Sequence, residues 1–201
     1  GYTHSCAVIG SGPEAGQVRC WGANYYGELG DGTIDMRLTS VLVSGLNNVS
    51  QIALGTFHSC ALMGSGPEAG QVRCWGANYY GELGDGTTTN SLTSVLVSGL
   101  NNVSQIALGT YHSCALMGSG PEAGLARCWG LNNYGQLGDG TKTSRNKPVY
   151  RMNLTNIQSI GISRGNHQCV VTSTQEVSCS GDNQSFQTGF NELTIRNVSG
   201  F

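Results

Sequence analysis

Residues 20–33 read Cys-Trp-Gly-Ala-Asn-Tyr-Tyr-Gly-Glu-Leu-Gly-Asp-Gly-Thr, and this stretch decides the fold because the chain repeats it. The same residues return unchanged at 74–87, and again as CWGLNNYGQLGDGT at 128–141. A shortened copy, CSGDNQSFQTG, begins at Cys179. The remaining residues connect these copies, so the chain is a repeat array.

A second motif, His-x-Cys, precedes each copy and gives the period of the array. It occurs at residues 4–6, 58–60, 112–114 and 167–169, so that successive motifs are 54, 54 and 55 residues apart. A fixed period of this size is typical of solenoids and propellers, in which no unit buries its apolar residues alone. The period divides one continuous domain into repeats at 1–54, 55–108 and 109–163 and a degenerate fourth repeat at 164–201.

Each repeat contains short runs with strand character, separated by turn signals. Around the second copy these runs are residues 71–75, 95–97, 103–108 and 113–117. No segment carries apolar residues at the spacing of an amphipathic helix. The sequence therefore predicts an all-β chain.

The composition excludes several classes of protein. Charged residues make up 11% of the 201 residues, and the net charge of −2 comes without any run of Lys or Arg. A nucleic-acid partner or an acidic membrane surface would require such a basic patch. No apolar run approaches the ~20 residues of a membrane span. Without an initiator Met or a signal peptide, we expect a mature chain or a piece of one.

The eight cysteines fall into four pairs, each flanking a connection: Cys6/Cys20, Cys60/Cys74, Cys114/Cys128 and Cys169/Cys179. If the flanking segments are neighbouring antiparallel strands, the facing cysteines lie about 4.5–5.5 Å apart at Cα, which is within disulfide range. Zinc is the alternative, but one His and two Cys per repeat leave a tetrahedral site one ligand short. We expect four disulfides and hence an extracellular or cell-surface protein.

The motif G-x-x-H-S-C-A-L, followed by a turn and V-x-C-W-G-x-N-x-Y-G-Q/E-L-G-D-G-T, resembles the RCC1-type repeat. It is most similar to the cysteine-bearing variety found in secreted and surface proteins of bacteria. The resemblance covers nearly the whole chain, strongly in the first three copies and weakly in the fourth. It implies β-propeller blades of four antiparallel strands, usually seven to a ring, and says little about function, because one fold serves unrelated roles.

This chain has about four repeats, and its two ends look like complementary halves of one blade. It begins at the His-x-Cys strand, and residues 193–199 match the strand that precedes this motif elsewhere. Pairing within the chain would close a four-bladed ring, whereas pairing between chains would give a larger ring or a filament. A window of a longer array is the third possibility.

Two sets of residues recur once per repeat and are expected to pack between blades. The tryptophans could instead form a sugar-stacking platform, and the histidines could act as ligands or acid–base groups. These residues are Trp21, Trp75, Trp129, His4, His58, His112 and His167. Asp31, Asp85 and Asp139 lie in Gly-Asp-Gly-Thr turns without the ligand spacing of a calcium loop. No catalytic residue, metal site or cofactor is expected.

Five Asn-x-Ser/Thr sequons could carry glycan, which would solubilise a chain with so few surface charges. They begin at Asn48, Asn102, Asn153, Asn183 and Asn197.

The leading hypothesis is an extracellular, non-enzymatic structural or interaction protein that self-associates head to tail into a glycosylated fibre or surface layer. The alternative is a discrete propeller module that binds a protein or carbohydrate through variable loops such as residues 34–37. The guanine-nucleotide exchange role of the founding family member is disfavoured by the disulfides and by the missing basic face.

Overall fold

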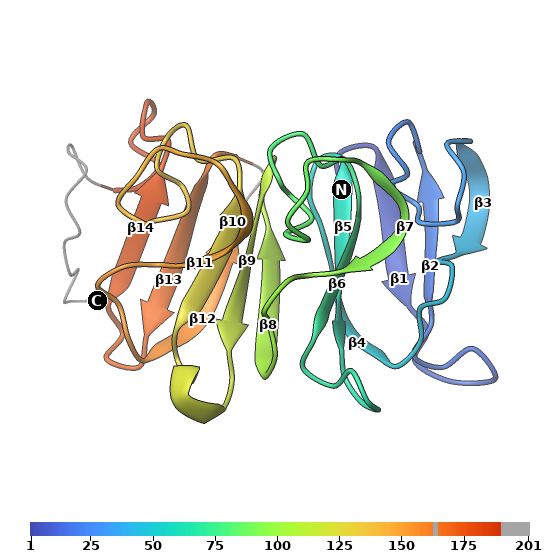
Figure 1. Cartoon of the computed structure of the whole chain (residues 1–201), viewed down its shortest axis with the longest axis horizontal. Helices are drawn as coiled ribbons and strands as arrows, with labels where there is room; N and C mark the ends of the chain where they lie inside the picture. Colours follow the sequence, from blue (N-terminus) through green and yellow to red (C-terminus); the bar gives the residue numbers. More distant parts are fainter. Residues whose placement is uncertain (163–164, 190–201) are drawn as a thin grey trace.

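The computed structural model describes residues 1–162 and 165–189, which form four antiparallel sheets arranged side by side as blades (Figure 1). The two middle blades have four strands each, in the orders β4-β5-β6-β7 and β8-β9-β10-β11. In the described residues the first blade has the order β1-β2-β3 and the last the order β12-β13-β14. The all-β prediction is confirmed; one short 3-10 turn, η1 (Gly120–Glu122), is the only helical element among the described residues.

The strands of each blade follow one another in the chain. Those of the first blade are β1 (His4–Val8), β2 (Val18–Gly22) and β3 (Arg37–Leu42). Those of the second are β4 (Val49–Leu54), β5 (His58–Met63), β6 (Val72–Gly76) and β7 (Ser91–Leu96). Those of the third are β8 (Val103–Leu108), β9 (His112–Met117), β10 (Ala126–Gly130) and β11 (Arg145–Tyr150). Those of the fourth are β12 (Ile157–Ile162), β13 (His167–Thr172) and β14 (Val177–Gly181).

The blades and the sequence repeats have different boundaries. The repeat at 55–108 supplies β5, β6 and β7 to one sheet and β8 to the next. Neighbouring blades are therefore joined covalently inside each of the first three repeats. The strand predicted at residues 193–199 lies outside the described residues.

Glutamine side chains join the first strands of successive blades. The Gln51 amide on β4 donates to the Ile106 carbonyl on β8 at 3.0 Å and accepts from the Ile106 N–H at 3.0 Å. Gln105 makes the same two bonds to Ile160 on β12, both at 3.1 Å. Each glutamine thus substitutes for a backbone amide between strands that belong to different sheets.

The glycine after each tryptophan turns the chain out of the sheet. Gly76 has a φ of 101°, and a Cβ at this position would lie 2.6 Å from the Phe57 carbonyl oxygen. The equivalent glycines, Gly22 and Gly130, have φ values of 112° and 98° and equally close carbonyl neighbours. Only glycine combines this backbone conformation with so close an approach, which explains the Trp-Gly pair in the repeated stretch.

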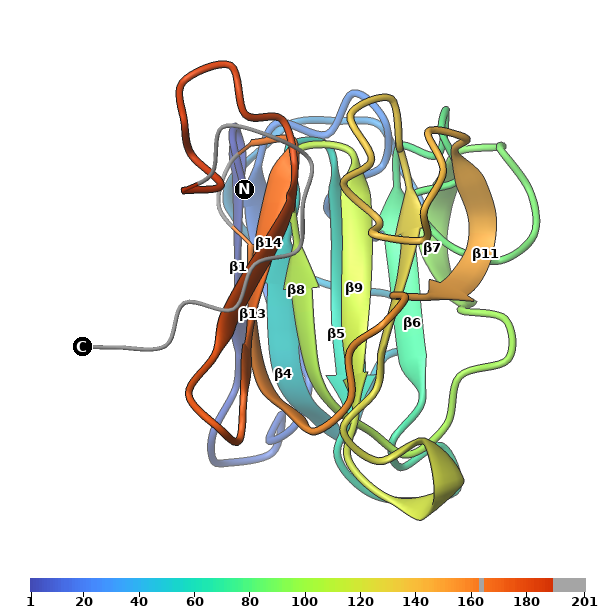
Figure 2. The same cartoon turned by 90° about the vertical axis from the view of Figure 1, so that its left-hand side faces the viewer.

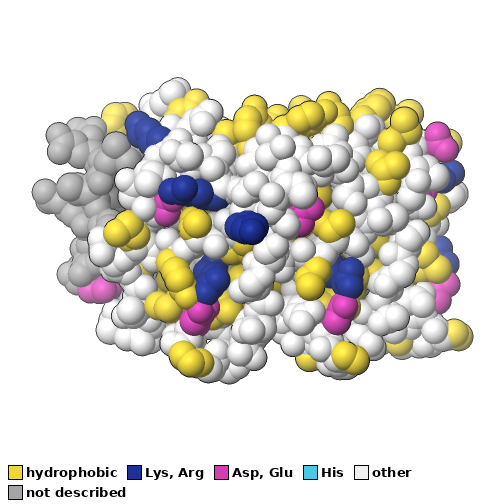
Figure 3. All heavy atoms as spheres, viewed as in Figure 1, with side chains coloured by type: hydrophobic (Ala, Val, Ile, Leu, Met, Phe, Trp, Pro, Cys, Tyr) yellow, Lys and Arg dark blue, Asp and Glu magenta, His cyan; other side chains and the backbone are white. Residues whose placement is uncertain are grey.

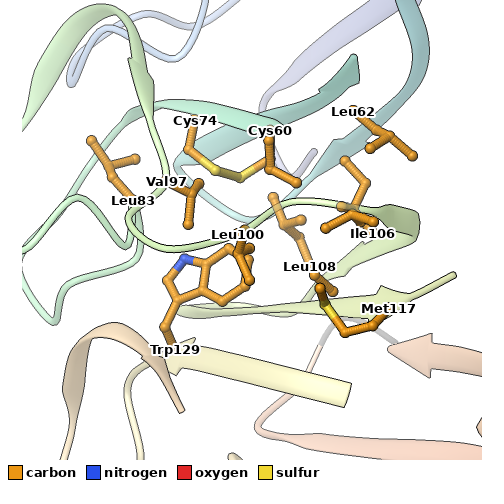
Figure 4. Close-up of a cluster of buried hydrophobic side chains, with 13 residues drawn as sticks. Cys60, Leu62, Cys74, Leu83, Val97, Leu100, Ile106, Leu108, Met117 and Trp129 are labelled. Atoms are coloured by element: carbon orange, nitrogen blue, oxygen red, sulfur yellow. A yellow bond between two sulfur atoms is a disulfide. The ribbon is translucent and has the colours of Figure 1, made fainter. Parts of the chain in front are cut away.

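The hydrophobic core lies between blades rather than within them. In Figure 4, Trp129 from β10 lies close to Val97, which follows β7 of the preceding blade, and to Leu100 in the connection to β8; Leu83 belongs to the same cluster. The Cys60–Cys74 disulfide belongs to the same buried cluster. Every blade therefore needs a neighbour to bury its apolar residues, as expected of a repeat fold.

Candidate functional site

The two ends of the blades carry different kinds of residue. The chain segments that lead into β5 and β9, and those that follow β2, β6 and β10, lie at the end shown uppermost in Figure 1. We call this the aromatic end. The opposite end, lowermost in Figure 1 and in Figure 2, carries η1 and the glycine-rich loops at 10–16, 64–70 and 118–124.

Five aromatic side chains form a continuous row at the aromatic end. The ring of Tyr26 lies 5.3 Å from Phe57 and 5.7 Å from Tyr79, in edge-on contacts. The ring of Tyr111 lies 6.2 Å from Phe57 and 5.5 Å from Tyr80. These centroid distances are in the range at which aromatic pairs attract one another. We call Tyr26, Phe57, Tyr79, Tyr80 and Tyr111 the aromatic row.

The row is produced by the meeting of neighbouring blades. Tyr26 follows β2 of the first blade, and Phe57 precedes β5 of the second. Tyr80 and Tyr111 repeat the same relation between the second and third blades. Tyr79 and Tyr80 are 58% and 41% exposed, and the other three rings are half-buried. The half-buried rings hold the exposed ones in place.

A self-contained turn fixes the tyrosine positions. Asn78, which is fully buried, accepts a hydrogen bond from the Leu83 N–H at 2.9 Å and donates through Nδ2 to the Thr89 carbonyl at 3.1 Å. Asp85 accepts from the N–H of Thr87 at 2.8 Å. Asn24 and Asn132 make equivalent bonds to Leu29 and Leu137 in their own blades. These aspartates thus stabilise turns, as the sequence predicts for Gly-Asp-Gly-Thr.

Buried carboxyl groups lie beneath the tyrosines. Glu82 is fully buried, and its Oε2 accepts the Tyr80 N–H at 2.8 Å while its Oε1 is buried without a partner. Burial raises the pKa of Glu82 from 4.5 to about 7. Glu28 has the same contacts in the first blade, and burial raises its pKa too. Gln136 takes this position in the third blade and accepts the Tyr134 N–H at 2.9 Å.

The five side chains of the aromatic row carry no charge, although exposed Asp35 and Lys142 lie on loops of the same end. Figure 3 shows a strip of hydrophobic side chains along the upper margin, without blue or magenta atoms within it. Burial, with Tyr80 and Glu82 nearby, raises the pKa of Tyr111, so that its hydroxyl stays protonated. Charged pairs lie at both ends. At the opposite end, Arg19 binds Glu14 and Arg73 binds Glu68, at 2.8 Å and 2.6 Å. In turns of the aromatic end, Arg37 binds Asp31 and Arg145 binds Asp139, at 2.7 Å and 2.9 Å.

The tryptophans differ between the first blade and the next two. Trp75 and Trp129 are fully buried, and their indole N–H groups donate to the carbonyls of Glu28 and Glu82 in the preceding blade, at 2.8 Å and 2.7 Å. Trp21 is 39% exposed. Within the described residues, no blade covers the surface that Trp21 faces. The inter-blade packing predicted for Trp21 is therefore not seen.

Three of the four repeat histidines are buried, and two of these bond to the next blade. His4 Nε2 lies 2.9 Å from Ser59 Oγ, and His58 Nε2 lies 2.9 Å from Ser113 Oγ. Burial lowers the pKa of His58 and that of His112 to about 3, so both rings are neutral. His112 lacks the serine partner because Gln168 stands at the equivalent position. His167 is half-buried.

At the junction of the third and fourth blades, an arginine–serine pair takes the place of the tryptophan. Ser180 occupies the tryptophan position, and Arg151 occupies the position of Val43 and Val97. The Arg151 guanidinium lies over Gly138 as Trp129 lies over Gly84, and donates to Ser180 Oγ at 2.6 Å. Burial lowers the pKa of Arg151 to about 10. A buried cation thus fills the space of the missing indole.

Each cysteine pair faces its partner across two adjacent antiparallel strands and is disulfide-bonded. The bonds are Cys6–Cys20, Cys60–Cys74, Cys114–Cys128 and Cys169–Cys179, with Cα–Cα distances of 4.0–4.1 Å. The disulfide prediction is therefore supported. Within residues 1–162 and 165–189, no three His, Cys, Asp or Glu side chains come together as a metal site. The described part of the chain also contains no helix long and apolar enough to span a bilayer.

The sequons fall into three groups. Asn48, Asn102 and Asn153 are exposed at the end opposite the aromatic row. Asn183 is half-buried at the aromatic end, where its Oδ1 accepts the Thr188 N–H at 3.0 Å, as Asn78 accepts from Leu83. This turn role argues against glycan on Asn183. Asn197 lies outside the described residues.

The aromatic row is not among the sites predicted from the sequence. Those predictions concerned the tryptophans, two of which are buried, and the variable loop 34–37. The missed signal is an aromatic residue directly before the His-x-Cys motif, at Phe57 and Tyr111, together with a Tyr-Tyr pair in the turn of the preceding repeat.

A family model described as the regulator of chromosome condensation (RCC1) repeat matches residues 15–62, 69–116 and 127–172, which is more than half of the chain. The chain belongs to the RCC1 repeat family. A second RCC1 repeat model matches residues 49–82 and 103–136.

RCC1-repeat proteins with quite different names are similar to this chain. It is 35% identical over 200 residues to the human probable E3 ubiquitin-protein ligase HERC6, covering 94% of the chain but 18% of HERC6. It is 32% identical over 152 residues to the Arabidopsis thaliana ultraviolet-B receptor UVR8, covering 74% of the chain and 32% of the receptor. The chain thus spans a minor part of each relative. The activities in their names are properties of those whole proteins.

Solved structures share the fold of this chain. Yeast RCC1 (Prp20) bound to Kap60 is 24% identical with a TM-score of 0.75, covering 97% of this chain and 43% of that chain. Human WBSCR16 is 21% identical with a TM-score of 0.78, covering 98% of this chain and 51% of that chain. The β-propeller blade architecture expected from the sequence is therefore confirmed.

Proposed function

We propose that this chain is part of an extracellular, non-enzymatic interaction module and that the aromatic end is its binding surface. The observation that carries the proposal is the aromatic row, whose exposed tyrosines are held by half-buried rings from the adjoining blades. Tyrosine gives a large, rigid contact area with a polar tip, which suits recognition.

The other features of the molecule are consistent with this role. Four disulfides stabilise the blades in an oxidising compartment. Glycan on Asn48, Asn102 and Asn153 would cover the opposite end and leave the aromatic row free. The described side chains with strongly shifted pKa values, such as Glu82 and His58, are buried within or between blades rather than gathered in a cleft.

Binding to extracellular material from the producing organism tests the proposal. Tyr79→Ala/Tyr80→Ala should lose most of this binding, because it removes the two most exposed rings of the row. Tyr150→Ala is the matched control, since Tyr150 is an exposed tyrosine (45%) on β11 that pairs with Arg127 away from the row. Equal binding by both variants would refute the aromatic end as the binding surface.

Head-to-tail self-association is the second candidate, and the exposed Trp21 favours it. Trp21 occupies the position at which Trp75 and Trp129 are buried by a preceding blade. A blade from a second copy could cover it in the same way. Sedimentation of the untagged protein would show concentration-dependent assembly that Trp21→Ala weakens; a monomer at all concentrations would exclude this candidate.

A further inference from the structure

The aromatic row has three properties that together narrow the chemistry of its ligand: it is apolar with hydroxyl tips, it is uncharged, and it repeats from blade to blade. The inference drawn from them rests on the proposed function, because it names the class of ligand for that same surface.

The first property is the chemistry of the rings. Four of the five members are tyrosines, and Tyr79 and Tyr80 are 58% and 41% exposed. A tyrosine ring offers an apolar face and a hydroxyl that both donates and accepts hydrogen bonds. A pyranose has the matching surfaces, with C–H groups on one face and hydroxyls around its rim.

The second property is the absence of charge from the row. Glu28 and Glu82 lie beneath it but are fully buried, and burial keeps the pKa of Glu82 near 7. Asp31, on the turn after Tyr26, is paired with Arg37 at 2.7 Å, and Asp85, on the turn after Tyr80, is partly exposed and accepts the Thr87 N–H. A polyanionic or polycationic ligand would require exposed charges of the opposite sign at the contact. The five rings themselves therefore fit a neutral ligand.

The third property is repetition. Tyr26 meets Phe57 at the junction of the first two blades, and Tyr80 meets Tyr111 at the next junction. A ligand that itself repeats can make the same contact at each junction, and linked contacts raise the overall affinity. Asn166 replaces the aromatic residue before His167, so the row does not continue across the junction of the third and fourth blades.

We propose that the aromatic row binds a neutral polysaccharide, whose sugar rings stack on Tyr79 and Tyr80. Tyr26 and Tyr111 support these two rings from the neighbouring blades, and Phe57 packs between Tyr26 and Tyr111. A proline-rich peptide is the competing occupant, because extended proline helices also dock on aromatic surfaces.

Native affinity electrophoresis and calorimetry with soluble polysaccharides test this inference. The neutral probes are hydroxyethyl cellulose, a soluble β-glucan and a galactomannan; polygalacturonate is the charged probe, and a polyproline peptide represents the competing occupant. At least one neutral probe should retard the protein, with an affinity that changes little between low and high salt, since no ion pairs form.

Variants locate the contact. Tyr79→Ala should weaken binding about tenfold, as expected for loss of one aromatic anchor, and Tyr79→Ala/Tyr80→Ala should weaken it further. Tyr80→Phe keeps the ring and should retain most of the affinity, and Tyr150→Ala should bind like the parent. Both substituted tyrosines are exposed, and unchanged melting temperatures would show that the variants fold.

The outcomes separate this inference from the proposed function. Binding of the polyproline peptide or polygalacturonate, but of no neutral polysaccharide, would overturn the inference; if that binding depended on Tyr79 and Tyr80, the aromatic end would remain the binding surface. Polysaccharide binding that Tyr79→Ala/Tyr80→Ala leaves unchanged would overturn both.

Discussion

Two blade junctions use different residues to pair a buried carbonyl and fill the space beside it. One lies between the second and third blades and the other between the third and fourth. At the former, the Trp129 indole donates to the Glu82 carbonyl, and Ser113 Oγ donates to the same oxygen. At the latter, Ser180 Oγ donates to the Gln136 carbonyl, and Arg151 occupies the indole's space.

The comparison shows which feature of the junction is essential to the fold. The carbonyl of Glu82 or Gln136 is a buried acceptor in both junctions, and leaving it unpaired would cost about 1–3 kcal/mol. The donor can be an indole or a hydroxyl, and the space over the glycine can be filled by an aromatic ring or a guanidinium. The repeat motif therefore keeps the buried carbonyl that accepts the hydrogen bond and varies the side chain that fills the space over the glycine.

The largest expected effect is that of Trp129→Ala at the Trp junction. Removing a fully buried indole should lower the free energy of unfolding by about 3–5 kcal/mol, because a cavity forms and the Glu82 carbonyl loses a donor. Urea denaturation measures this loss. Trp21→Ala is the matched control, and its effect should be less than half as large, since Trp21 is already 39% exposed. Equal losses would mean that the exposed surface at Trp21 is covered in solution.

The second prediction concerns the side chains of the two acceptor residues, Glu82 and Gln136. The pKa of Glu82 is about 7 in the folded state against 4.5 for an unburied glutamate. Between these pH values the unfolded chain releases the proton and the folded chain keeps it, so stability falls as the pH rises. Below pH 4.5 both states hold the proton and this effect is absent.

Glu82→Gln copies the third blade and should remove this pH dependence. The variant should be more stable than the parent by roughly 3 kcal/mol above pH 7, and equal to it below pH 4.5. The buried histidines titrate in both proteins, so the difference between the two denaturation series isolates Glu82. A constant difference from pH 4 to pH 8 would show that Glu82 is ionised in the folded state.

The third prediction converts the Arg junction into a Trp junction. Arg151→Val alone should cost about 2–3 kcal/mol, because it opens a cavity beside Ser180. Ser180→Trp alone should also destabilise by about 1–3 kcal/mol, since the indole and Arg151 would compete for one space. Together they restore the residue types of the Trp junction, and the double variant should be close to the parent in urea denaturation. Additive losses would show that Arg151 and Ser180 are independent replacements.

These pairs also show how far the sequence predicts the molecule. The period, the strand runs and the cysteine spacing predicted the blades and their disulfides, because these features are local to one repeat. Arg151 and Ser180 are far apart in the chain. At Ser180 the sequence shows only that the tryptophan of the motif is missing. Their compensation appears when β14 packs against the preceding blade.

The aromatic row was missed for the same reason. Tyr26 and Phe57 belong to different repeats and meet only across a blade junction. The period alone cannot show which end of a strand faces which neighbour. Trp21 shows the opposite error. It shares the repeat motif with Trp75 and was therefore predicted to pack between blades, but no preceding blade covers it in the described residues.

The smallest expected effect is that of the histidine–serine bond, which is present at the Trp junction and absent at the Arg junction. The Ser113 hydroxyl hydrogen is directed to the Glu82 carbonyl, so Ser113 Oγ accepts from the His58 Nε2–H at 2.9 Å. Ser113→Ala would leave His58 like His112, whose Nε2 is already buried without a partner. The loss should be about 1–2 kcal/mol in urea denaturation at pH 7.

Ser59→Ala repeats this deletion one blade earlier, where Ser59 lies between His4 and the Glu28 carbonyl in the same arrangement. A similar loss at both sites would establish the bond as a stabilising element of each Trp junction. A loss near zero at both would mean that a neutral, unpaired imidazole is tolerated at every junction. In that case Gln168 is a neutral replacement for serine, and the difference between the two junctions lies in the tryptophan alone.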